Sequence, residues 1–202
     1  EIASIYRCDL TLVISEFEMA LLQDFFKVPA SQLLYLPFMV EAITKDEVKR
    51  WKSLKDRKHF VTIGNFRHEP NWLSVRYLKT EIWPHIRKQL PDAEMHVYGS
   101  YPAEKHSQLH NPREKFQVLG RAESAHEVIE DSRVLLAPLL TGAGLKGKLL
   151  DAMQCGTPAV TTSVGAEGMH GKLPFNGSIA DTPEAFAQAA IDLYSNSESW
   201  QE

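Results

Sequence analysis

Short apolar runs alternate with stretches of helical periodicity along most of the chain. The runs are rich in valine, isoleucine and leucine, and continuous apolar segments of this length are typical of strands buried on both faces. They predict strands over residues 9–14, 33–37, 60–63, 95–98, 116–119, 134–137 and 158–162. Residues 41–57 are polar enough to form a loop or an exposed helix.

The segments between these runs predict helices. Ser15 and Glu18 fit a capping box at the start of a helix that Pro29 stops, and Pro70 suits the first position of a later helix. Pro84 lies within that later helix and should kink it. Further helices are expected over 103–110, from Ser124, over 145–153 and from Pro183.

The regular alternation of strand and helix predicts an α/β fold, with a mostly parallel sheet and helices on both faces. In such sheets, ligands bind at the carboxyl ends of the strands. Four expected strands are followed by a glycine at this end, namely Gly64, Gly99, Gly120 and Gly142. A glycine lets a ligand approach the backbone closely, although each of these four also suits an ordinary strand-to-helix turn.

The segment from Gly142 to Lys148 carries the strongest sign of a binding site. It follows an expected strand and opens an expected helix, so unpaired backbone N–H groups and the helix dipole face outwards. Gly142 and Gly144 keep the backbone accessible, and Lys146 and Lys148 add two positive charges. These features predict a phosphate or diphosphate site. In the alternative interpretation, the lysines are solvated and Lys148 pairs with Asp151.

The same segment also spells G-x-G-x-x-G, which can mark a dinucleotide site. Glu167 lies about 20 residues further on, where an acid that binds the ribose of NAD(P) would be sought. We do not favour this interpretation, because the motif comes late in the alternation and Glu167 lies in a turn beyond its strand.

Two further segments are candidates for ligand contacts. The expected turn Gly165-Ala166-Glu167-Gly168 offers backbone N–H groups, and Glu167 offers a carboxylate that accepts hydrogen bonds from sugar hydroxyls. Arg67, which follows Gly64, offers a planar cation for phosphate. In the alternative interpretations, Glu167 is a solvated loop acid and Arg67 is an ordinary surface arginine.

Composition excludes several classes of protein. The 202 residues carry a formal net charge of −4, which excludes general nucleic-acid binding and means that any anion site must be built locally. No apolar run is long enough for a membrane span, and no signal peptide is visible. With two cysteines far apart, we expect small buried thiols and a reduced, cytoplasmic compartment. The eight histidines are scattered, so no metal site is expected.

With these pieces assembled, the chain resembles the group 1 retaining glycosyltransferases of the GT-B fold. The resemblance is strongest over residues 142–162, where a glycine-rich loop leads into the helix Leu149-Leu150-Asp151-Ala152-Met153 and the strand after Gly156-Thr157-Pro158. It extends to residues 165–168 and to Pro70-Asn71. Residues 8–18 resemble the last strand and helix of the family's N-terminal domain, and residues 33–38 resemble its linker.

The resemblance implies a fragment of a two-domain enzyme. Residues 1–38 would be the tail of the N-terminal GT-B domain and its linker, and residues 39–202 would form the C-terminal, Rossmann-like donor domain. The family transfers a sugar from a nucleoside diphosphate sugar with retained configuration. The resemblance therefore implies a UDP- or GDP-sugar donor, no cofactor or metal, a sugar or lipid-linked acceptor, and a location in the cytoplasm or at the membrane periphery. The missing N-terminal domain would be a partner in the same protein, and the fragment alone would be inactive.

The resemblance also assigns roles to residues. Asp151 takes the position of the acid that binds the nucleotide ribose, and Ala143 takes the position of the family's sugar-contacting acid. Diphosphate would be held by Gly142, Gly144, Lys146 and Lys148, with Gly64 and Arg67 closing from the other side. Gly165, Ala166 and Glu167 would line the sugar pocket. Two other functions remain open: an NAD(P)-dependent oxidoreductase and a non-catalytic interaction domain.

Overall fold

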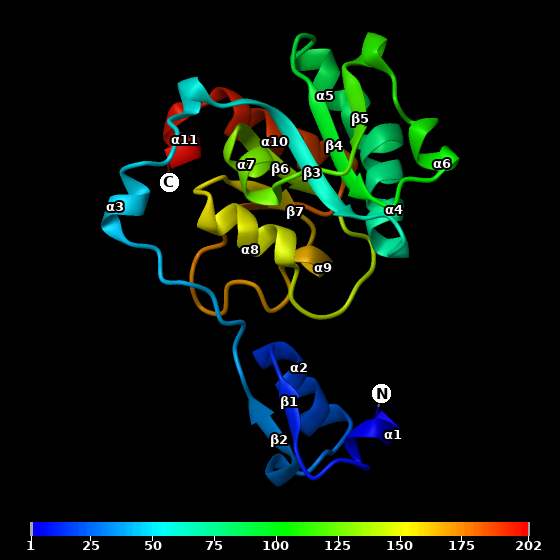
Figure 1. The fold of residues 1–202 in the computed structure, drawn as a ribbon, viewed down its shortest axis with the longest axis vertical. Helices are drawn as coiled ribbons and strands as arrows, with labels where there is room; N and C mark the ends of the chain where they lie inside the picture. Colours follow the sequence, from blue (N-terminus) through cyan, green and yellow to red (C-terminus); the bar gives the residue numbers. More distant parts are fainter. Residues whose placement is uncertain (1, 202) are drawn as a thin grey trace.

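The computed structural model describes residues 2–201, which form a small N-terminal unit joined by a long linker to a larger α/β unit (Figure 1). The small unit pairs two parallel strands, β1 and β2, beside short helical segments. Its elements are α1 (Ile2–Ile5), β1 (Thr11–Val13), α2 (Glu16–Ala20), η1 (Leu21–Phe25), η2 (Ala30–Gln32) and β2 (Leu33–Tyr35). The linker contains α3 (Lys45–Val48) and η3 (Leu54–Asp56).

The larger unit is built on a six-stranded sheet in which every neighbouring pair is parallel, in the order β5-β4-β3-β6-β7-β8. Its strands are β3 (Lys58–Asn65), β4 (Met95–Ser100), β5 (Phe116–Gly120), β6 (Ser132–Ala137), β7 (Ala159–Thr161) and β8 (Gly177–Ile179). The predicted parallel α/β fold is therefore confirmed. Because all six strands run the same way, their carboxyl ends share one edge, and Gly64 pairs with Gly99 there.

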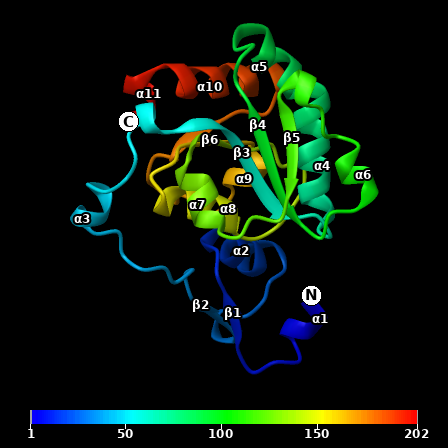
Figure 2. The same ribbon diagram turned by 45° about the horizontal axis from the view of Figure 1, so that its top comes forward.

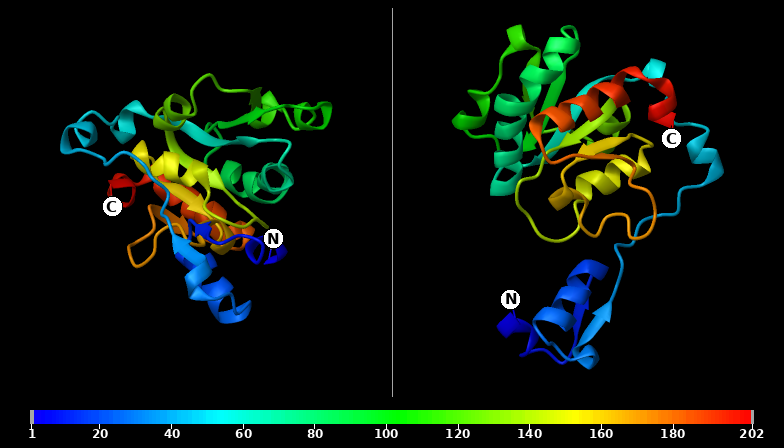
Figure 3. Two further views of the ribbon diagram at one scale, coloured as in Figure 1. Left: turned by 60° about the horizontal axis from the view of Figure 1, so that its bottom comes forward. Right: turned by 180° about the vertical axis from the view of Figure 1, so that it is seen from behind.

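Helices cover both faces of this sheet (Figures 2 and 3). They are α4 (Glu69–Tyr77), η4 (Leu78–Ile82), α5 (Trp83–Gln89), α6 (Glu104–Ser107), η5 (Pro112–Glu114), α7 (Ala125–Glu130), α8 (Gly147–Gln154), α9 (Ser163–Ala166), α10 (Pro183–Ser195) and α11 (Ser197–Gln201). Within residues 2–201, every helix falls short of the length and apolar character that a membrane span requires.

Two apolar cores follow from the alternation of side chains along the strands. Phe60 packs with α4, α5 and α10 in the larger core, whereas its neighbour Val61 packs with α7 and α8 in the smaller one. Val134 and Leu135 divide between the two cores in the same way. The central strands β3 and β6 therefore bury side chains on both of their faces, which explains their continuous apolar runs in the sequence.

The predicted interruption in the helix after β3 is present. The helix passes through the π-helical turn η4, and α5 then begins with Pro84 in its first turn. The missing N–H of proline is not needed in the first turn of a helix, so the chain tolerates Pro84 there.

Two local expectations are wrong, and one strand was not predicted. Residues 163–166 form the short helix α9, which Thr162 caps, so the segment expected to be a turn is partly helical. The edge strand β8 was not expected. Cys8 is exposed, whereas Cys155 is buried as expected.

A stacked pair of histidines at the opposite edge of the sheet makes the stability of the fold depend on pH. The rings of His59 and His96 lie 3.7 Å apart, and His96 also contacts Glu94. Burial, followed by the neighbouring His96, lowers the pKa of His59 to about 4. The folded protein therefore favours neutral His59, and this stability is present above the unfolded pKa of about 6.5 and lost as the pH falls towards 4.

We expect urea denaturation to show wild-type protein losing about 1 kcal/mol more between pH 7 and pH 4.5 than His59→Gln, a figure that allows for the partial exposure of the ring. The exposed His85→Gln is the matched control. Equal losses for wild type and His59→Gln would show that His59 titrates normally in the folded protein.

Candidate functional site

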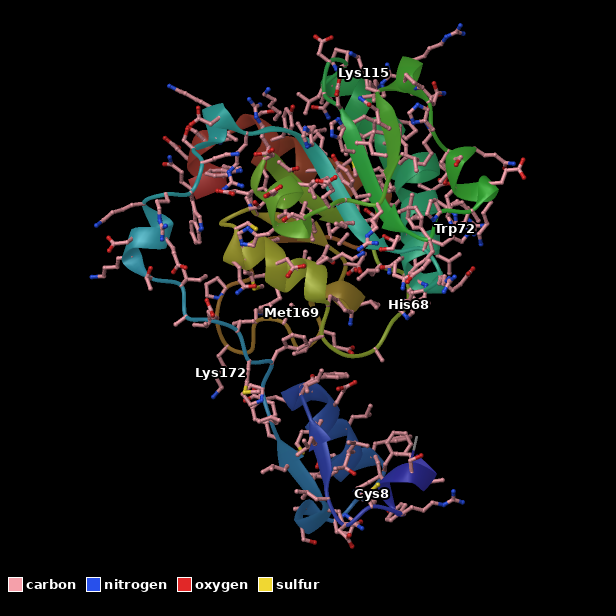
Figure 4. The ribbon with its side chains drawn as sticks, viewed as in Figure 1. Cys8, His68, Trp72, Lys115, Met169 and Lys172 are labelled. Atoms are coloured by element: carbon pink, nitrogen blue, oxygen red, sulfur yellow. The ribbon has the colours of Figure 1, made fainter. Side chains whose placement is uncertain are left out.

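A pocket of about 350 Å³ opens at the carboxyl edge of the sheet, where the sequence places its glycines. The end of β3, the start of α4, the loop after β6 and the first turns of α8 surround it. Figure 4 labels His68, one of the lining residues, just before α4. A pocket of this size at this edge lies within the usual range of small-molecule sites.

The structure brings six of the predicted site residues to this pocket. They are Gly64, Gly142, Ala143, Lys146, Lys148 and Asp151. Gly144 belongs to the same loop but does not line the pocket. The parallel topology thus brings residues from positions as far apart as 64 and 151 to one edge of the sheet.

The loop before α8 requires its glycines. Gly142 and Gly144 have φ angles of +143° and +69°, which side chains rarely adopt. Within residues 2–201, no side chain caps the N-terminus of α8, so the first backbone N–H groups of this helix remain available to an anion. This geometry suits an anion, and the phosphate cradle stays a prediction.

Lys148 contributes a positive charge that no carboxylate cancels. Its ammonium donates a hydrogen bond to Oδ1 of Asn71 at 2.8 Å, and no acid among residues 2–201 lies within ion-pair distance of it. The alternative pairing with Asp151 is therefore not formed. Burial lowers the pKa of Lys148 to about 8. A desolvated cation of this kind is stabilised by an anionic ligand.

Lys146 is buried and turned towards its own loop. Its ammonium donates to the backbone carbonyl of Gly144, and its N–H donates to the sulfur of Met169, which Figure 4 labels. Burial lowers the pKa of Lys146, while Glu167 and Glu18 act in the opposite direction. Lys146 thus holds the glycine loop in shape as well as adding charge beside it.

Asp151 lines the pocket one turn of α8 after Lys148. Burial raises the pKa of this carboxyl, and nearby His126 partly offsets the effect. A partly buried carboxylate without a salt-bridge partner among the described residues is a good acceptor for ligand hydroxyls.

Besides Gly144, four predicted residues lie outside this pocket. The guanidinium of Arg67 stacks over the ring of Tyr101 at 3.9 Å. Gly165 is buried, and a side chain there would collide with the hydroxyl of Thr161. Ala166 and Glu167 line a neighbouring pocket, whose other wall includes Glu16 and Phe17 from the small unit.

Sequence reasoning missed Asn71, whose amide contacts Lys148 inside the pocket. Its position in the first turn of the helix after β3 was a usable signal, because that turn must lie at the carboxyl edge of the sheet. Among the described residues, no three His, Cys, Asp or Glu side chains are placed to share a metal ion.

Solved structures share this fold at low sequence identity. A TarM variant from Staphylococcus aureus, in complex with UDP and other ligands, matches with a TM-score of 0.75 and 13% identity, over 100% of this chain and 40% of that chain. The pneumococcal O-GlcNAc transferase GtfA, in complex with UDP and GlcNAc, matches with a TM-score of 0.68 and 19% identity, over 98% and 41%. WaaG, a glycosyltransferase involved in lipopolysaccharide biosynthesis, matches with a TM-score of 0.66 and 14% identity, over 94% and 55%.

The chain thus spans about half or less of the length of these structures. A sequence search among curated proteins finds no match. The family model described as "Glycosyl transferases group 1" matches residues 57–196, which is well over half of the chain and includes the whole pocket. The chain therefore belongs to the group 1 glycosyltransferase family.

Proposed function

We propose that this chain is the donor-binding half of a retaining glycosyltransferase that transfers a sugar from a nucleoside diphosphate sugar. The observation that carries the proposal is the ammonium of Lys148, which lies beside the N-terminus of α8 and is paired with no acid among the described residues. The leaving diphosphate needs fixed dipoles and cations of this kind. The complexes of TarM and GtfA with UDP support a nucleotide of the same class.

The proposal assigns each part of the donor to a part of the site. Gly142, Gly144 and Lys148 would hold the diphosphate, and Asp151 would accept the ribose hydroxyls. The sugar would extend towards the neighbouring pocket, where Glu167 lies. Arg67 would join the phosphates only by leaving its stack on Tyr101.

We further propose that residues 1–38 close an N-terminal domain and that residues 39–202 form the donor domain. The helical segment after Ser15 supports this division, because its apolar side chains Phe17, Leu21 and Phe25 are exposed in the small unit. Exposed apolar side chains of this kind are suited to packing against another part of the protein. The acceptor, a sugar or a lipid-linked sugar, would bind mainly to that domain, and the enzyme would act in the cytoplasm or at the membrane periphery.

Ligand-induced stabilisation tests the proposal. UDP or GDP at about 100 times its dissociation constant should stabilise the chain by about 2.7 kcal/mol, which raises the melting temperature by about 5 to 10 °C. NAD and NADP are the controls. The proposal fails if only the dinucleotides stabilise the chain, because the glycine loop would then serve an oxidoreductase. An interaction domain is indicated if neither class binds and the full-length protein transfers no sugar.

A further inference from the structure

Asn71 connects the two sides of the pocket. It lies in the first turn of α4, and its side-chain N–H donates to the carbonyl oxygen of Asn65 at 3.0 Å. Its Oδ1 accepts from the ammonium of Lys148 at 2.8 Å. One amide group therefore fixes the ammonium of α8 to the end of β3, across 77 residues of sequence.

Gly64 leaves the space that this amide occupies. A Cβ atom at position 64 would lie 2.8 Å from Cγ of Asn71, which is closer than real side chains approach one another. The φ angle of Gly64 is not in the left-handed region, so the backbone does not require glycine here. Glycine is required at position 64 because the side chain of Asn71 packs against it.

The chemistry of an amide suits this place better than that of an acid. A carboxylate would accept from the ammonium but would cancel its charge and could not donate to the carbonyl oxygen of Asn65, and an apolar side chain would leave the ammonium without an acceptor. The other charged or titratable side chains that line the pocket are His68 before α4, and Lys146 and Asp151 at α8. None of them forms an ion pair with Lys148.

We propose that Asn71 is a positioning residue, which holds the ammonium of Lys148 in place while leaving its charge free for the diphosphate of the donor. This inference rests on the proposed function. It has a consequence for pH, because burial lowers the pKa of Lys148 to about 8 and a bound diphosphate favours the charged lysine. Above pH 8, binding must therefore take up a proton, and the affinity should fall by up to about tenfold per pH unit.

The decisive variant is Asn71→Asp, which keeps the shape of the side chain, adds one negative charge and removes the N–H donor to Asn65. We expect isothermal titration with UDP and GDP at pH 7 to show an affinity at least about tenfold weaker than wild type. The fall in affinity between pH 8 and pH 9.5 should disappear, because the new carboxylate keeps Lys148 charged. Gln108→Glu, which converts an exposed amide to an acid outside the pocket, is the matched control and should behave as wild type.

A second readout needs no ligand. Competitive acetylation of the free protein, read by mass spectrometry, reports the pKa of Lys148 directly, and we expect about 8 in wild type and about 10 in Asn71→Asp. Asn71→Ala and Gly64→Ala should both weaken nucleotide binding. The first substitution removes the amide, and the second adds a methyl group that displaces it.

The outcomes separate the two proposals. If wild type binds UDP or GDP but Asn71→Asp matches Gln108→Glu in affinity, pH profile and labelling, the role of Asn71 is refuted and the proposed function stands. If wild type binds neither nucleotide, the proposed function fails and the role of Asn71 towards a donor fails with it, even where labelling shows that Asn71 holds Lys148.

Discussion

Replacing Lys148 with methionine should weaken the binding of UDP or GDP by roughly 10- to 100-fold. The substitution keeps an unbranched side chain of similar length but removes the charge-assisted hydrogen bond to phosphate, which is worth about 1.5 to 3 kcal/mol. Isothermal titration of the chain at pH 7 measures the loss. The folded protein should be as stable as wild type or more so, because the variant no longer buries a cation without an acid partner.

The matched control for this prediction is Lys172→Met. Lys172 is exposed in the loop after α9, away from the pocket, and Figure 4 labels it there. The Lys172→Met substitution removes the same charge from the chain as a whole as Lys148→Met does. An affinity for nucleotide that is equal in the two variants would mean that Lys148 does not contact the phosphates.

Replacing Arg57 with methionine should lower the free energy of unfolding by about 3 to 5 kcal/mol. Arg57 is fully buried just before β3, and its guanidinium donates to the carbonyl oxygens of Lys52, Ser132 and Cys155 and to the hydroxyl of Thr157. Methionine leaves these buried acceptors without their donor. The linker, the start of β6 and the turn after α8 would all lose a shared contact.

Thermal unfolding checks the Arg57 prediction, and for a chain of this size the expected loss lowers the melting temperature by about 10 °C. Arg113→Met is the control, because Arg113 is an exposed arginine. If Arg57→Met melts within about 2 °C of that control, the guanidinium does not hold these elements together. Nucleotide binding at low temperature should survive in Arg57→Met, since Arg57 does not line the pocket.

The fold could be predicted largely because its strands bury both faces. Val61 and Val134 belong to short, continuous apolar runs that alternate with helical segments, and the glycines that follow these runs mark the carboxyl edge. The edge strand β8 gave no such signal, because Gly177-Ser178-Ile179 lies at the edge of the sheet and is mostly exposed. The helix α9 was hidden by Gly165, whose small size is required by packing on Thr161.

Some residues of the candidate site could likewise be predicted from the sequence, and others could not. The glycine loop and Lys148 could be found because charge, glycine spacing and a helix start coincide in seven consecutive residues. For Asn71 the sequence indicates only its place at the carboxyl edge of the sheet and not its contact, because a neutral amide has no distinctive pattern and Lys148 lies far away in sequence. Arg67 shows the opposite case, in which a plausible phosphate ligand is engaged by an aromatic ring.

A crystal structure of the chain with UDP or GDP tests the central claim most directly. We expect the phosphates to lie between the N-terminus of α8 and the turn after β3, with a phosphate oxygen about 3 Å from the ammonium of Lys148. A nucleotide bound elsewhere, or one whose phosphates lie out of reach of Lys148, would contradict it.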